Sequence, residues 1–143
     1  MRARAWLTLG LCLLAHGARA DAALLSATLR CERAPGPGRV ICEVSASTSR
    51  GKLVWSDALI VRVPAFARPM RSRFSARLGP SNRTASAKFA VLALQAGAGT
   101  VELLARGVVC RVGPGAESCL PSQVSVTTWL EVGEAPSAPP PSP

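Results

Sequence analysis

Apolar and polar residues alternate along most of the chain, and turn-forming residues interrupt the alternation at short intervals. From Leu25 to Cys31 the alternation is strict, so that Leu25, Leu29 and Cys31 share one face. After the turn signal Ala-Pro-Gly-Pro-Gly, the segment 40–47 repeats the pattern. A period of two residues is typical of β-strands that have one buried face.

Further segments with strand character follow at 52–56, 58–63, 70–78, 84–94, 99–110 and 123–132. The alanine-rich part of 84–94 could form a helix by propensity, but its neighbours are strand-like and Gly97 and Gly99 follow it, so we expect a strand. In 52–56, Leu53 and Trp55 are expected on one face. Seven or eight short strands predict an all-β fold, an immunoglobulin-like β-sandwich of two antiparallel sheets.

The N-terminus resembles a secretory signal peptide. Arg2 and Arg4 precede an apolar run over 5–15, and Ala18-Arg19-Ala20 has the small-residue spacing of a cleavage site. We expect cleavage before Asp21 and export to the periplasm or the extracellular space. The run is too short to cross a bilayer as a helix, so no transmembrane segment is expected after cleavage. The predicted organisation is a signal peptide (1–20), one β-sandwich domain (21–132) and a Pro-rich disordered tail (133–143).

Composition excludes several classes of chemistry. The single histidine, His16, lies in the predicted signal peptide, so the exported chain lacks the histidine that Ser-His-Asp and Cys-His nucleophiles and the usual hydrolytic zinc sites need. The acidic residues Glu43, Asp57 and Glu102 are single charges on separate strands, not a converging pair. No metal site and no cofactor are predicted.

The charge is strongly basic, with a formal net charge of +9. Cleavage would lower it to about +6, because it removes three arginines and no acidic residue. Alternation in 70–78 places Arg71, Arg73 and Arg77 on one face, which makes them candidates for binding an anionic surface. The alternative is a solvated edge that discourages aggregation. Nucleic acid is disfavoured as a partner, because the nearby aromatic residue, Phe74, faces the other way.

Four cysteines of the expected exported chain predict two disulfides. Each of the local pairs, Cys31 with Cys42 and Cys110 with Cys119, brackets a turn that contains Gly-Pro, and this favours local pairing. The alternative pairs Cys42 with Cys110 around Trp55, as in immunoglobulin domains. Alternation weakens that alternative, because it puts Cys110 on the polar face of its strand. Cys31 and Cys42 are expected to face inward, and Cys110 outward toward solvent, where nearby arginines would favour a thiolate.

The run Gly-Val-Val-Cys over 107–110, the Cys-Leu-Pro-Ser of 119–122 and the strand that follows resemble the end of one known family. These are the N-terminal periplasmic domains of the thiol:disulfide interchange protein DsbD, which have an immunoglobulin-like fold. The resemblance covers residues 107–132 and implies that Cys110 and Cys119 exchange electrons with a thioredoxin-like partner through mixed disulfides. Cys31 and Cys42 have no counterpart in that family.

Together these patterns favour an exported, disulfide-stabilised β-sandwich that acts as a binding or structural module without catalytic activity, with an unidentified protein as its partner. The first alternative is a thiol-disulfide exchange module that uses Cys110 and Cys119. The second is binding of an anionic surface through Arg71, Arg73 and Arg77.

Overall fold

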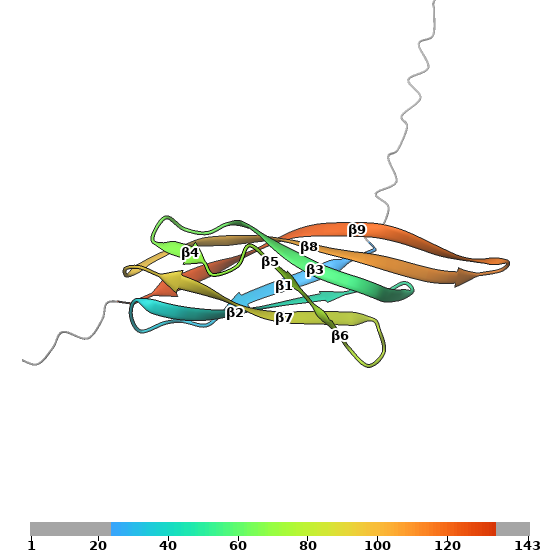
Figure 1. The fold of residues 1–143 in the computed structure, drawn as a ribbon, viewed down its shortest axis with the longest axis horizontal. Helices are drawn as coiled ribbons and strands as arrows, with labels where there is room; N and C mark the ends of the chain where they lie inside the picture. Colours follow the sequence, from blue (N-terminus) through green and yellow to red (C-terminus); the bar gives the residue numbers. More distant parts are fainter. Residues whose placement is uncertain (1–23, 134–143) are drawn as a thin grey trace, which may run out of the picture.

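The computed structural model describes residues 24–133, which form nine β-strands and no helix (Figure 1). The predicted signal peptide, with His16, and residues 134–143 of the predicted tail lie outside the described residues. The strands are β1 (Ser26–Cys31), β2 (Gly38–Ser47), β3 (Lys52–Arg62), β4 (Ala67–Pro69), β5 (Arg73–Ser75), β6 (Arg77–Leu78), β7 (Thr84–Ala93), β8 (Gly97–Gly113) and β9 (Ala116–Val132).

The strands form two antiparallel sheets. The first sheet has the order β1-β2-β7-β4, with β6 also paired to β7, and the second sheet has the order β5-β3-β8-β9. This arrangement confirms the predicted all-β class and the two packed sheets. The alanine-rich segment is strand β7, as expected from its neighbours. Within residues 24–133, nothing in the structure is a helix with the length and apolar character needed to span a membrane.

The core lies between the two sheets and follows the alternation of the sequence. Side chains of β2 and β7 face it from the first sheet, and side chains of β3, β8 and β9 face it from the second. The most completely buried members include Val40, Val91, Leu53, Val101, Leu103 and Leu130. The facing predicted for the segments 25–31 and 40–47 is therefore correct, whereas the facing predicted for 52–56 is not.

Strand β3 differs from the prediction because it contains two β-bulges. The segments 52–56 and 58–63 form a single strand, whose register against β8 shifts at Val54 and again at Val61. Leu53 faces the core, but the extra residue at Val54 turns Trp55 to the opposite face, where it is 42% exposed. The expectation that Leu53 and Trp55 share a face is therefore wrong, since a bulge reverses the alternation that follows it.

The predicted strand over 70–78 is divided between the two sheets. β5 pairs with β3 in the second sheet, and β6 pairs with β7 in the first. This segment therefore crosses from one sheet to the other, as Figure 1 shows. The alternation still holds, because Arg73 and Arg77 are exposed while Phe74 points inward and stacks on Phe89 with ring centroids 4.7 Å apart.

The β8–β9 hairpin is longer than predicted and extends beyond the sandwich (Figure 1). The two strands pair without interruption from Gly97 and Val132 to Gly113 and Ala116. β3 stops pairing with β8 at Cys110, so beyond that residue β8 pairs with β9 alone. The turn at the tip uses Gly115 with a positive φ of 103°, a conformation that glycine adopts without strain.

Candidate functional site

Both disulfides join residues that lie directly opposite each other on neighbouring antiparallel strands. Cys31 of β1 is bonded to Cys42 of β2, and Cys110 of β8 is bonded to Cys119 of β9. The predicted local pairing is confirmed, and the alternative bond between Cys42 and Cys110 is wrong. Two disulfides are typical of proteins from an oxidising, exported compartment.

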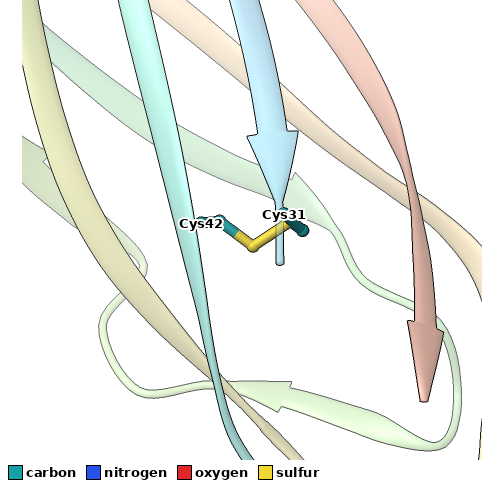
Figure 2. The surroundings of a disulfide bond; sticks show 2 residues. All are labelled: Cys31 and Cys42. Atoms are coloured by element: carbon teal, nitrogen blue, oxygen red, sulfur yellow. A yellow bond between two sulfur atoms is a disulfide. The ribbon is translucent and has the colours of Figure 1, made fainter. Parts of the chain in front are cut away.

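The disulfide between Cys31 and Cys42 belongs to the core. Figure 2 shows this bond, which joins β1 to β2. Cys42 is 1% exposed and packs among the buried side chains of the first sheet, while Cys31 is partly buried against the same cluster. Both side chains face inward, as the alternation predicts. This bond fastens the edge strand β1 to the sheet.

The disulfide between Cys110 and Cys119 lies at the base of the hairpin tip. Register places Cys110 on the same outer face of the second sheet as Arg106, as predicted. Its expected solvent exposure is wrong, because Cys110 is only 5% exposed. The reason is its position in a central strand, between Lys52 of β3 and Cys119 of β9. Cys119 is exposed, and a carboxylate oxygen of Glu117 lies within 4.8 Å of both sulfurs.

The three candidate arginines do not act as one group. Arg73 of β5 bonds to Asp57 in the second sheet, whereas Arg77 of β6 belongs to the first sheet. Arg71 lies in the connection before β5, where it lines a groove together with Arg39 and Lys88. Binding of an anionic surface stays a prediction, and the structure groups Arg71 with these two cations instead of with Arg73 and Arg77.

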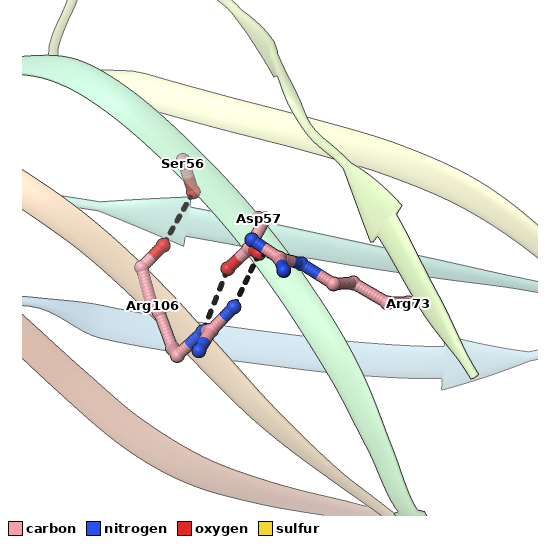
Figure 3. A network of polar contacts seen from close by, with 4 residues as sticks. All are labelled: Ser56, Asp57, Arg73 and Arg106. Carbon is pink, nitrogen blue, oxygen red and sulfur yellow. Dashed lines mark hydrogen bonds and ion pairs between the residues drawn. The ribbon is translucent and has the colours of Figure 1, made fainter.

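The outer face of the second sheet carries a buried carboxylate between two arginines (Figure 3). Asp57 of β3 has a side chain that is 2% exposed. Arg106 donates from Nε to Oδ1 over 2.8 Å and from Nη2 to Oδ2 over 2.5 Å, and Arg73 donates from Nε to Oδ2 over 2.6 Å. Ser56 Oγ also donates to the carbonyl oxygen of Arg106 over 3.0 Å. Arg106 is thereby fixed at both its backbone and its guanidinium.

This network explains why Asp57 stays ionised although it is buried. Burial by itself would raise the pKa of Asp57, but the hydrogen bonds and positive charges of Arg106 and Arg73 outweigh it and hold that pKa below its usual value. Hydrogen bonding to Asp57 in turn raises the pKa of the Arg106 guanidinium. Two arginines thus compensate one carboxylate, and the site keeps a net positive charge.

A groove of about 460 Å³ runs beside this network on the outer face. It is lined by two cross-strand rows, an apolar one of Trp55, Val108 and Pro121 and a polar one that contains Arg106 and Gln123. The guanidinium carbon of Arg106 lies 5.8 Å from the centre of the Trp55 ring, within the range of a cation–π contact. The buried carboxylate of Asp57 is therefore connected to the groove through contacts that run from Asp57 to Arg106 and from Arg106 to Trp55.

Sequence reasoning did not find this groove. It placed Trp55 on the same face as Leu53 and took Asp57 as a single charge. The available signal was the pair of apolar residues Val54-Trp55, which breaks the alternation at the bulge. The contact between Asp57 and Arg106 depends on the pairing of β3 with β8, across 49 residues of sequence, and alternation alone does not supply that pairing.

Comparison with known proteins adds no relative, since no protein-family model matches the chain and no curated protein does.

Proposed function

We propose that the protein is an exported binding module without catalytic activity, and that it holds an extended, proline-rich polypeptide segment in the groove beside Trp55. The observation that carries the proposal is the outward position of Trp55, which a bulge turns away from the core and Arg106 holds in place. Tryptophan and arginine are the residue types that most often dominate binding energy at protein interfaces.

The dimensions and lining of the groove suit this role. Its volume of about 460 Å³ falls within the range of ligand sites. The apolar surface of the groove runs across three neighbouring strands, from Trp55 through Val108 to Pro121. Proline-rich segments dock into grooves of this aromatic-lined kind.

The polar row favours the same class of ligand. A polyproline II segment has no internal hydrogen bonds, so its carbonyl oxygens need donors when it binds. Arg106 has five N–H donors, of which two are used on Asp57, and the Gln123 amide adds further donors. The groove therefore combines an apolar surface for proline rings with donors for the backbone.

The ion pairs of Asp57 also reduce the entropic cost of binding. A free arginine side chain loses rotamer freedom when it contacts a ligand, and this cost lowers affinity. In this protein Arg106 is already held by two hydrogen bonds from its guanidinium, and Trp55 lies beneath that guanidinium. Both residues are thus ordered before a ligand arrives.

A calorimetric titration with an end-blocked decamer of proline tests the proposal. We expect saturable binding to the protein, and we expect Trp55→Ala to weaken it by about thirtyfold, the loss typical of a hot-spot residue. Val61→Ala is the matched control, because Val61 is also an exposed apolar residue of β3 at a bulge but does not line the groove. Absence of binding, or equal affinity in Trp55→Ala, would overturn the proposal.

A second candidate function is thiol-disulfide exchange through Cys110 and Cys119, and the exposure of Cys119 favours it. A partner thiolate would attack Sγ of Cys119, and Cys110 would leave as a thiolate. A second partner thiolate would then release Cys119, so that the partner becomes oxidised and this chain gains two electrons. The Glu117 carboxylate near both sulfurs opposes this reaction, because it repels an incoming thiolate.

We expect the reduction potential of the disulfide between Cys110 and Cys119 to lie below about −300 mV, in the range of structural bonds. The physical reasons are the burial of Cys110 and the charge of Glu117. Equilibration with glutathione and dithiothreitol buffers, followed by mass mapping of the thiols, measures it. The bond between Cys31 and Cys42 serves as the internal reference, and a potential well above that reference would favour the exchange function instead.

A further inference from the structure

Strand β9 forms an edge of the second sheet that is largely unpaired. Among the described residues, the far side of β9 takes part in backbone hydrogen bonding only near its end, where the Ala34 amide donates to the carbonyl of Glu131 and the Gly133 amide donates to the carbonyl of Ala34. β1 of the first sheet lies near β9 without further backbone hydrogen bonds to it. The stretch 118–130 therefore has backbone groups available for another strand.

This edge lacks the charged side chains that usually prevent strand addition. The other edge strands, β1, β4, β5 and β6, each contain an arginine, whereas residues 118–130 contain no charged residue. Exposed edges in natural proteins are usually protected by charges, and an uncharged, strand-forming edge is a template for pairing. Leu120 and Trp129, at the two ends of the stretch, are 42% and 62% exposed.

The geometry identifies which residues of β9 point their backbone groups outward. The carbonyl of Glu131 accepts from Ala34, on the side away from β8, and residues at every second position share its orientation. The 4.0 Å between the α-carbons of Cys110 and Cys119 indicates a non-hydrogen-bonded pair of β8 and β9. The backbone groups of Cys119 therefore also point away from β8, as do those of every second residue along β9. Gln123, Ser125 and Thr127 therefore direct N–H and C=O outward. Pro121 belongs to the same set, so its backbone nitrogen faces away from β8 and the pairing with β8 loses no hydrogen bond there.

The uncharged stretch is also close to a palindrome in chemical type. Around Ser125, Val124 mirrors Val126, and the outer positions mirror one another as Gln123 with Thr127, Ser122 with Thr128, Pro121 with Trp129 and Leu120 with Leu130. An antiparallel pair of identical strands with its two-fold axis at Ser125 would place each residue opposite its mirror position. Apolar residues would then meet apolar ones, and small polar residues would meet polar ones.

We propose that a second copy of this chain is the partner of this edge, through antiparallel pairing of the two β9 strands with the axis at Ser125. The pairing joins the second sheet of one chain to the second sheet of the other, so that they form one continuous sheet. It forms about eight hydrogen bonds between the chains. It also places Trp129 of the partner subunit beside Pro121, which lines the groove. Each groove is then extended by an aromatic ring from the other chain.

Sedimentation velocity and amide hydrogen exchange on the purified protein, with both disulfides formed, test this proposal. We expect a concentration-dependent dimer, in which the amides of Gln123, Ser125 and Thr127 exchange slowly. These three amides separate this edge from any other interface, because no hydrogen bond among residues 24–133 protects them. A monomer at every concentration, or a dimer in which they exchange as freely as exposed amides, would overturn the proposal.

Two variants add a test that is independent of exchange. Ser125→Glu places two glutamates opposite each other at the axis, and the Glu102 carboxylate, which accepts a hydrogen bond from Ser125 in each chain, adds to the repulsion. The dimer should weaken at least a hundredfold. Ser45→Glu adds the same charge to the exposed face of β2 in the first sheet and should leave the dimer intact. If Ser125→Glu remains dimeric, the interface lies elsewhere and the proposal fails. If Ser125→Glu does not fold, the exchange of the wild-type amides decides.

Discussion

Replacing Asp57 with asparagine is expected to lower the free energy of unfolding by about 2 to 3 kcal/mol at neutral pH. Both carboxylate oxygens of Asp57 accept hydrogen bonds from arginines, and its side chain is 2% exposed. The asparagine amide group turns one of these acceptors into a donor that faces another donor. Chemical denaturation followed by tryptophan fluorescence measures the loss.

The pH dependence of this loss has a definite sign. Because the pKa of Asp57 in the folded protein lies below its usual value of 3.8, the ion pairs stabilise the fold fully above that value. The stabilisation disappears as pH falls from there through the folded pKa, since the carboxyl must then be protonated. The difference in stability between wild type and Asp57→Asn should therefore shrink in acid. A difference that does not change with pH would contradict an electrostatic role.

Glu102→Gln is the matched control for Asp57→Asn. Glu102 accepts a hydrogen bond from Arg62 over 3.0 Å, but their side chains are 25% and 70% exposed. Such an ion pair near the surface contributes no more than about 1 kcal/mol, because water screens it. The two substitutions make the same chemical change, so a larger effect at Asp57 measures what burial adds.

Replacing Cys31 and Cys42 together with alanine is expected to cost about 3 kcal/mol of stability. Closing a loop of this length removes a little under about 3 kcal/mol of chain entropy from the unfolded state, and Cys42 also packs in the core. Thermal unfolding of the double variant should show a lower midpoint with a single cooperative transition.

The double alanine variant of Cys110 and Cys119 is the comparison, because its loop is similar in length. We expect less than half the loss, since beyond Cys110 β8 pairs with β9 alone, and the tip can open without unfolding the sandwich. Equal losses from the two double variants would contradict this difference between a core bond and a tip bond.

Much of the fold could be predicted because alternation reports directly on which side chains are buried. The all-β class, the two sheets, the inward face of Cys42 and the local disulfides all follow from a period of two residues and from turn chemistry. The division of 70–78 between two sheets could not be predicted in this way. Arg73 and Arg77 alternate as in one strand, and only the pairing partners differ.

The candidate site could not be predicted from the sequence, for two physical reasons. The bulge at Val54 reverses the facing of Trp55, and alternation cannot show a bulge until the partner strand is known. The burial of Asp57 depends on arginines from β5 and β8, which are close only in the folded protein. For Cys110 the predicted face was correct, but the predicted exposure to solvent was wrong. The residues on the neighbouring strands bury its side chain from both sides.

The measurement that tests the proposed function most directly is the ¹H–¹⁵N spectrum of the protein during titration with the proline decamer. We expect the Trp55 indole resonance to shift and saturate together with the backbone amides of Val108 and Gln123, which border the groove on β8 and β9. The same series with Trp55→Ala should need about thirtyfold more decamer to produce the same shifts of those amides. Shifts confined to residues away from the groove, or no saturable shift of the Trp55 indole, would contradict the proposal.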